Sequence, residues 1–149
     1  ALLKANEEQA RALGLQPMGY KLAGPTPDIE GAFASAKKEG AEGVLLLEEP
    51  IVFIHRKKIA QVAASNRMPT MVPGDWADVG GLIAYGAGLL EGMGRMSVYV
   101  DKILKGAKPG DLPVEALTRY QLTINLQTAR GIGVTIPAEV LKRADKVID

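Results

Sequence analysis

Two short clusters of polar residues stand where the chain leaves an apolar run, and they are the first candidates for chemistry. Glu48 and Glu49 directly follow the run 43–47, and Asp75 and Trp76 follow a second short run. Neighbouring residues of an extended chain point to opposite faces, so the two glutamates do not form a natural acid and base pair for one bond. We expect one of them to reach a ligand while the other caps the next helix or pairs on the surface.

Asp75 and Trp76 are better suited to recognising a ligand than to catalysing a reaction. An indole offers a flat apolar face for stacking, and a carboxylate can bind an ammonium group. A second interpretation is equally simple: Trp76 covers the edge of a sheet, and Asp75 caps the turn before Gly80. Both interpretations stay open at the level of the sequence.

A glycine-rich segment could in principle bind a nucleotide. Residues 86–92 (GAGLLEG) follow a predicted strand and precede a predicted helix, which is the context of a degenerate dinucleotide-binding turn. Such a turn needs an acidic residue at the end of the next strand, about 20 residues on, but Asp111 lies in a loop rich in Gly and Pro. The simpler hypothesis is a flexible crossing between packed units, and a nucleotide-using enzyme would require saturable binding of NAD or NADP.

Other catalytic constellations have no support in the sequence. Three serines, Ser35, Ser65 and Ser97, fall within predicted helices, and His55 is the single histidine, so no Ser-His-acid arrangement is indicated. The absence of cysteine excludes disulfides, thiolate metal sites and a Cys nucleophile, and it leaves a zinc site with one histidine and carboxylates. We therefore expect no enzymatic activity, no cofactor and no metal.

The element that must position the candidate residues is the apolar run itself. Four consecutive apolar residues in 43–47, without alternation, predict a strand buried on both faces, as in a parallel sheet covered by helices. Ligands of open α/β sheets bind beyond the carboxyl ends of the strands. Glu48, Glu49 and Pro50 are therefore predicted to lie at the rim of a cleft.

The remaining elements follow from periodicity and from turn residues. Residues 29–40 predict a helix with acidic residues near its start and lysines near its end, and 52–66 predict another, whose residues 55–58 form a basic group. A solvated helix face explains that basic group more simply than an anion site. Further helices are predicted at 1–13, 93–104 and 137–143, and further strands at 15–22, 69–73, 80–86 and 120–126.

These elements predict an α/β fold with a three-layer, doubly wound and mainly parallel sheet. The length of 149 residues suits one such domain, and the net charge of +1 gives no basic footprint for nucleic acid, so we expect no nucleic-acid partner. The first predicted helix has no strand before it, and the chain begins without an initiator Met or a signal segment. We therefore expect a fragment or a processed chain.

The later half of the chain resembles a known family. Residues 80–86 (GGLIAYG), 100–115 (VDKILKGAKPGDLPVE), 122–129 (LTINLQTA) and 131–137 (GIGVTIP), followed by Arg143-Ala144-Asp145, are similar in order and spacing to the ABC-transporter substrate-binding proteins that include the tryptophan-type members. Looser similarity extends back to about Ala10, so the resemblance covers nearly the whole chain.

The resemblance implies one lobe of a type I periplasmic-binding-protein fold. Residues 1–149 would form the C-terminal lobe of a two-lobed protein, and 84–118 would cross to a missing N-terminal lobe and pack on it. The implied partners are a small-molecule ligand and the membrane permease of an ABC transporter. The implied location is periplasmic or extracytoplasmic, with the export signal upstream. The apolar stripe of helix 93–104 would then be partly exposed, and an isolated lobe would form a non-physiological homodimer through it.

The resulting hypothesis is an importer component that binds a small metabolite, an amino acid or an aromatic compound, in a cleft between two lobes. The cleft would be formed by residues at the strand ends: Thr26, Glu48, Glu49, Asp75, Trp76 and Tyr85. The chain departs from the family at two places. Family members usually have polar residues shortly after the Tyr-Gly turn, where this chain has residues 87–94 (AGLLEGMG). They also usually have a polar residue and Pro where this chain has Ala116 and Leu117. The alternative is an effector-sensing regulatory domain of the same fold.

Overall fold

A computed structural model describes residues 2–74, 76–87, 89–116 and 119–149, with the side chains of 89–91 left out. The helices of the described chain include two short 3₁₀ turns, η1 and η2. They are α1 (Leu2–Ala12), α2 (Ile29–Lys38), α3 (Pro50–Ile54), α4 (Arg56–Ser65), η1 (Trp76–Val79), α5 (Leu89–Leu104), η2 (Pro109–Asp111), α6 (Leu126–Ile132) and α7 (Ala138–Leu141). The strands are β1 (Val44–Leu45), β2 (Thr70–Pro73), β3 (Ile83–Ala87), β4 (Tyr120–Asn125) and β5 (Lys146–Ile148).

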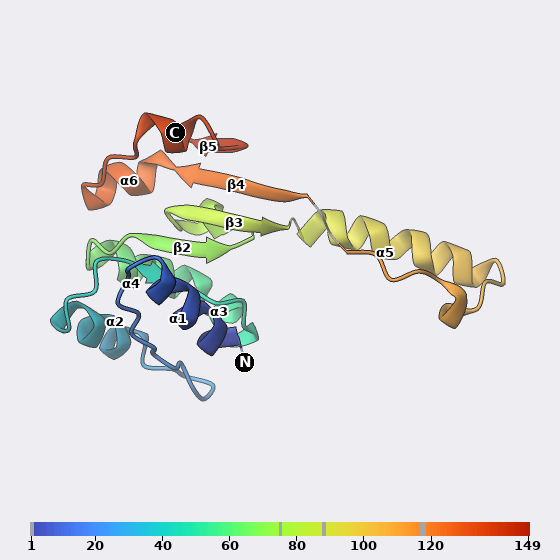
Figure 1. Cartoon of the computed structure of the whole chain (residues 1–149), viewed down its shortest axis with the longest axis horizontal. Coiled ribbons are helices and arrows are strands. Elements are labelled where there is room, and N and C mark those ends of the chain that lie inside the picture. Colours follow the sequence, from blue (N-terminus) through green and yellow to red (C-terminus); the bar gives the residue numbers. More distant parts are fainter. Residues whose placement is uncertain (1, 75, 88, 117–118) are drawn as a thin grey trace.

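The five described strands form one sheet in the order β1-β2-β3-β4-β5 (Figure 1). The pairs β1-β2, β2-β3 and β4-β5 are parallel, and β3-β4 is antiparallel. The predicted mainly parallel α/β sheet flanked by helices is therefore confirmed. The antiparallel pair follows from the long excursion between β3 and β4, which takes the chain out of the sheet and returns it in the opposite direction.

The main core lies between this sheet and the helices α2, α3 and α4 with η1. Val72 and Ala84 pair across β2 and β3 and are both buried, and Ile59 of α4 is almost inaccessible. The buried members of this core are Ile29, Phe33, Val52, Ile59, Val62, Ala63, Met68, Val72, Trp76, Ala77 and Ala84. Apolar burial of this kind is the main favourable term in folding, so this cluster holds the strand ends in place.

We call the sheet and its flanking helices (residues 2–74, 76–87 and 119–149) the body, and residues 89–116 the arm. Figure 1 shows α5 and the segment after it extending away from the sheet. The apolar residues of α5 include six that are exposed: Met93, Met96, Val98, Val100, Ile103 and Leu104. The exposed apolar stripe expected on this helix is thus present. Among the described residues, we find no helix with the length and apolar character needed to cross a membrane.

The helix and strand predictions for the body differ from the structure at several elements. The run 43–47 was predicted to be a strand buried on both faces, but β1 covers only Val44–Leu45, lies at the edge of the described sheet and leaves Leu45 52% exposed.

Residues 15–22 were predicted to be a strand, but they lie outside the sheet and form no ladder. Leu15 and Tyr20 are exposed, while Leu22 packs against the main core. A strand needs a hydrogen-bonded neighbour as well as a suitable pattern, and the edge strand β1 pairs only with β2 in the described sheet.

The predicted single helix 52–66 is divided at His55. The backbone of His55 leaves helical geometry (φ −96°, ψ 10°), so α3 ends there and α4 begins at the next residue. The last carbonyls of a helix lack partners within it. One of them, the Phe53 carbonyl, accepts a hydrogen bond from the Arg56 side chain at 3.0 Å, which matters for the site below.

Two elements near the C-terminus were not predicted. The alternation in 120–126 was interpreted as strand only, but α6 begins at Leu126, because the Asn125 side chain accepts a hydrogen bond from the Thr128 amide at 2.8 Å. Gly133 ends α6 in the left-handed region (φ 78°). The second element, β5, is short and pairs with β4. The predicted helix 137–143 is present in shorter form as α7, whereas the predicted strand 80–86 is displaced, and β3 begins at Ile83.

Candidate functional site

A wide cleft lies at the carboxyl ends of β2 and β3, between the body and the arm. Its volume of about 1450 Å³ exceeds the roughly 300–1000 Å³ of a typical small-molecule pocket. Its walls come from both regions: Glu48, Glu49, Phe53, Arg56, Pro73, Gly74, Trp76, Val79, Tyr85, Gly86, Ala87 and Tyr120 from the body, and Gly92, Met93, Arg95, Met96, Tyr99, Ile103, Pro109, Leu112, Pro113, Val114, Glu115 and Ala116 from the arm. The cleft is therefore a wide, open space between the two regions and not a closed pocket.

Four of the six predicted site residues line this cleft. Glu48, Glu49, Trp76 and Tyr85 come from three separate segments and meet there. Thr26 is exposed in the loop before α2 and is not among the lining residues. Asp75 lies outside the described residues, so its predicted role stays a prediction. The two glutamates are both exposed, as the rim of a cleft requires.

Trp76 belongs both to the main core and to the lining of the cleft. Its side chain is only 8% exposed and belongs to the main core. The same side chain also lines the cleft, and its ring lies 6.1 Å from that of Phe53 at an interplanar angle of 59°. Tilted aromatic pairs at this separation are favourable. Trp76 and Phe53 therefore form an apolar floor of the cleft, in which Trp76 is held by the core and Phe53 is about half exposed.

The turn η1, which carries Trp76, is anchored from the opposite side of the body. The Asn125 side chain is buried and donates a hydrogen bond to the Ala77 carbonyl at 2.8 Å, while its oxygen caps α6. The hydroxyl of Thr128 donates to the Gly80 carbonyl at 3.2 Å. The buried Asn125 bond restrains η1, because breaking it would leave buried polar groups without a partner.

Gly86 brings β3 close to the loop after β2. A Cβ atom at Gly86 would lie 2.8 Å from the amide nitrogen of Gly74 and 3.3 Å from its Cα. The missing side chain at Gly86 therefore permits a close backbone approach, which is a packing role. This explains the first glycine of the segment 86–92 without a nucleotide. Gly88 lies outside the described residues.

Tyr85 and Tyr120 form an aromatic pair where the chain leaves and re-enters the sheet. Their rings are stacked, with centroids 5.6 Å apart and planes inclined by 21°, and both side chains are about half exposed. Tyr85 stands on β3 and Tyr120 on the adjacent antiparallel strand β4. The pair offers a flat apolar surface at the junction of body and arm, next to Gly86.

A guanidinium group lies on the body side of the cleft. Arg56 is half-buried, and its Cζ atom lies 4.4 Å from the centroid of the Phe53 ring. Its Nη1 atom donates to the Phe53 carbonyl at 3.0 Å. A cation over an aromatic face and a charge-assisted hydrogen bond together restrict the side chain to one position. Sequence reasoning placed Arg56 on a solvated helix face, and the structure places it in the cleft.

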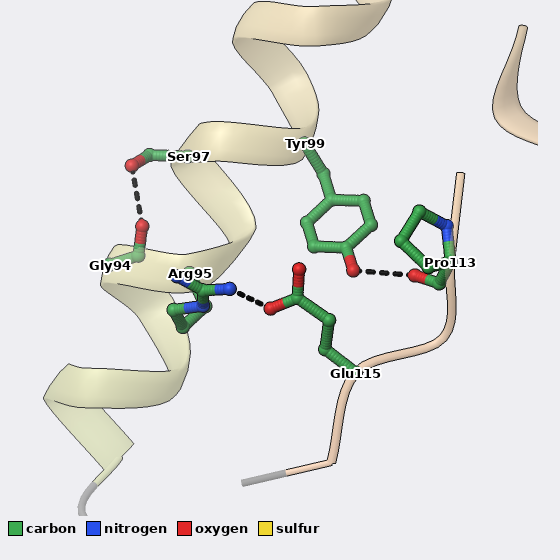
Figure 2. Close-up of polar contacts among 6 residues, drawn as sticks. All are labelled: Gly94, Arg95, Ser97, Tyr99, Pro113 and Glu115. Atoms are coloured by element: carbon green, nitrogen blue, oxygen red, sulfur yellow. Dashed lines mark hydrogen bonds and ion pairs between the residues drawn. The ribbon is translucent and has the colours of Figure 1, made fainter.

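The arm wall of the cleft is held together by its own polar contacts. Figure 2 shows Arg95 of α5 paired with Glu115, and the Tyr99 hydroxyl donating to the Pro113 carbonyl at 2.6 Å. The Ser97 hydroxyl donates to the Gly94 carbonyl at 2.7 Å on the same helix. The contacts of Arg95 and Tyr99 tie the returning segment to α5, so the arm is a hairpin of helix and returning chain.

Comparison with known protein families assigns this architecture. The model of the ABC transporter substrate binding protein family matches residues 11–148. The chain belongs to this family. No curated protein sequence was found to match the chain significantly.

Solved structures have the same fold at low sequence identity. A conserved domain protein from Vibrio cholerae O1 biovar El Tor superposes with a TM-score of 0.82 at 23% identity, covering 98% of this chain and 49% of its own. The ABC domain from Streptococcus pneumonia in complex with L-Trp superposes with a TM-score of 0.83 at 22% sequence identity. The match covers 99% of this chain and 50% of that structure's chain. The ligand-free, open structure of a substrate-binding protein with adhesive properties from Clostridium difficile superposes with a TM-score of 0.65 at 15% sequence identity. The match covers 98% of this chain and 48% of that structure's chain.

This chain spans about half the length of the solved structures that it matches. Its family is one of substrate-binding proteins, whose members are typically extracytoplasmic and bind a small molecule for an ABC permease.

Three residues of the body wall were not predicted from the sequence: Arg56, Phe53 and Tyr120. A signal for the first two was available, because they follow Pro50 soon after the apolar run 44–47, and ligand sites of α/β sheets lie beyond the ends of strands. Tyr120 gave no such signal, since its partner Tyr85 is remote in sequence and only the antiparallel pairing of β3 with β4 brings them together.

Proposed function

We propose that this chain is the C-terminal lobe of the substrate-binding component of an ABC importer. The observation that carries the proposal is the meeting of Glu48, Glu49, Trp76 and Tyr85 from three segments at one open cleft. A carboxylate of Glu48 or Glu49 binds an amine of the ligand, and the aromatic floor accepts its apolar part. The ligand is a small metabolite, an amino acid or an aromatic compound. The lobe binds it and makes or breaks no covalent bond.

The arm completes this proposal. Residues 84–118 cross to a second, N-terminal lobe and pack on it with the apolar stripe of α5, and two observations support this. The stripe is exposed in the described structure, and the chain has about half the length of its structural relatives. The open cleft becomes a closed site when the ligand contacts both lobes, because its differential affinity favours the closed state.

The proposed partners follow from this role. The closed protein delivers its ligand to a membrane permease, and the protein works in the periplasm or outside the cytoplasm, directed there by an export signal upstream. The exposed stripe of α5 also supports a non-physiological homodimer of the isolated lobe, since an apolar patch that lacks its intended cover associates with another copy.

Native mass spectrometry of the complete protein, as purified and then denatured, tests the function. We expect a mass roughly twice that of this chain, as the half-length coverage of relatives implies, and the release of one small metabolite. A parent of only this length that carries no metabolite, and that binds none when offered the standard amino acids, would contradict the proposal.

A further inference from the structure

We propose that the stacked pair of Tyr85 and Tyr120 braces the junction between the body and the arm, so that it sets the direction of the arm and the width of the cleft. Tyr120 is then a positioning residue, whose role requires no contact with a ligand. The inference concerns the geometry of the cleft and stands apart from what the cleft binds.

The junction is a narrow part of the sheet. Figure 1 shows β3 and β4 side by side where they run toward α5. The strand β2 pairs with β3 as far as Tyr85, and β5 pairs with β4 from Thr123 onward. The last two rungs of the β3-β4 ladder, at Gly86 and Ala87, lie beyond both. In the described sheet these rungs form a two-stranded end, and two-stranded ribbons twist more than wide sheets.

The stack joins the supported part of the sheet to this two-stranded end. Tyr120 pairs with Ala87 in the last rung, and Tyr85 shares the face of Ala87 because side chains alternate along a strand. The two tyrosines are therefore diagonal neighbours, a separation that aromatic side chains can bridge. Their rings do so, with centroids 5.6 Å apart and planes inclined by 21°.

A stack of flat rings resists a change of twist. Twisting the end of the ladder slides one ring across the other and reduces their contact, so the stacked state favours one twist. Gly86 stands between Tyr85 and Ala87 and has no side chain to pack across the ladder. The rings thus provide the cross-strand side-chain contact that Gly86 does not.

The twist at this end of the ladder decides where the arm points. The chain leaves the ladder after Ala87 to enter α5 and re-enters it at Tyr120. The polar contacts that join α5 to the returning segment make the arm one hairpin (Figure 2). Both tyrosine rings also line the cleft. A change of twist therefore moves the arm wall as a unit and widens or narrows the cleft.

Distances between two spin labels test this inference. The chain has no cysteine, so Lys57→Cys on the body and Lys108→Cys on the arm, both at exposed positions, provide the two labelling sites. The labelled chain is diluted into an excess of unlabelled chain, so that distances between copies do not contribute. Pulsed electron paramagnetic resonance then measures the distribution of distances between the labels.

The informative variant is Tyr120→Val, which removes the ring and keeps a residue that favours strands. We expect it to raise the population outside the native distance distribution by about two- to tenfold, the factor that an aromatic pair provides. Tyr120→Phe keeps the ring without the hydroxyl and should leave the distribution unchanged.

Two further comparisons identify the stack as the cause. Val147→Ala removes an exposed apolar side chain from β5 of the same sheet, away from the junction, and should leave the distribution unchanged. Tyr85→Val should have the same effect as Tyr120→Val. The double variant should do no more than either single variant, because each of them removes the same contact.

Three results would overturn the inference: an unchanged distribution in folded Tyr120→Val, a Tyr120→Phe variant that behaves like Tyr120→Val, or effects at the two tyrosines that add. Circular dichroism establishes that each variant is folded. If Tyr120→Val does not fold, Tyr85→Val and Tyr120→Leu, which keeps apolar bulk without a flat ring, give the same comparison. Ligand binding is not among the readouts, so a failure of the proposed function leaves this test intact.

Discussion

The body and the arm contain similar apolar residues and use them in opposite ways. In the body, Ile59 of α4 is 1% exposed and packs against the sheet. In the arm, Ile103 of α5 is 40% exposed and Leu104 is 81% exposed. The body thus contains a buried apolar core, whereas none of the described side chains of α5 (residues 92–104) is buried. The difference shows that an amphipathic pattern predicts a helix but does not say what covers its apolar face.

The site is built at the boundary between these two regions. The body supplies a rigid wall, because Trp76 is packed in the core and η1 is anchored by Asn125. The arm supplies a wall whose polar contacts lie at the surface, at exposed or half-buried side chains. A rigid wall facing a less constrained one is the arrangement expected of a site that opens and closes around a ligand.

The largest expected contrast comes from a matched pair of core and arm variants. Ile59→Ala leaves a cavity in the main core and should lower the free energy of unfolding by about 2–5 kcal/mol. Ile103→Ala removes the same atoms from an exposed position and should change it by about 0.5 kcal/mol or less. Urea denaturation followed by circular dichroism measures both. Equal losses in the two variants would mean that the arm is packed as tightly as the body.

A second matched pair uses glycines. Gly86→Ala places a methyl group against the Gly74 backbone and should lower the free energy of unfolding by about 1–3 kcal/mol, and it should also weaken ligand binding by displacing the cleft wall. Gly94→Ala in α5 meets no atom within 4 Å and should stabilise the helix by about 0.5–1 kcal/mol. Denaturation and hydrogen exchange of the α5 amides report the two effects, and a neutral Gly86→Ala would contradict the close approach.

The smallest effect is a pH dependence confined to the body surface. The hydrogen bond and ion pair from Lys58 hold the pKa of Glu30 below its ordinary value of 4.5. A lowered pKa in the folded state means that the stabilisation is present at neutral pH and is lost as the pH falls below about 4.5 through the folded pKa.

Denaturation at several pH values measures this dependence. Glu30→Gln should remove this pH dependence without changing the fold. Lys58→Gln should remove the part of it that comes from the contact with Lys58. Because both side chains are more than half exposed, solvent screens the pair and the change should be small. A large effect would indicate that another group titrates in the same range.

Much of the body could be predicted because its signals are local. The helix α2 has apolar residues on one face, acidic and basic residues at the appropriate ends, and Asp28, whose side chain accepts the Gly31 amide. These signals depend on neighbours within a few residues. The segment 15–22 was predicted to be a strand and forms none, because a ladder depends on a neighbouring strand that the local sequence does not specify.

The residues of the candidate site divide in the same way, into those with a local signal and those that depend on contacts between distant segments. The sequence by itself predicted the α/β class and placed Glu48 and Glu49 directly after an apolar run that forms a strand. Only the tertiary structure decided that Arg56 faces the cleft, that Trp76 serves core and cleft together, and that Tyr85 stacks on Tyr120. The physical reason is range: strand and helix signals arise from neighbouring residues, whereas a site arises from contacts between segments that only packing brings together.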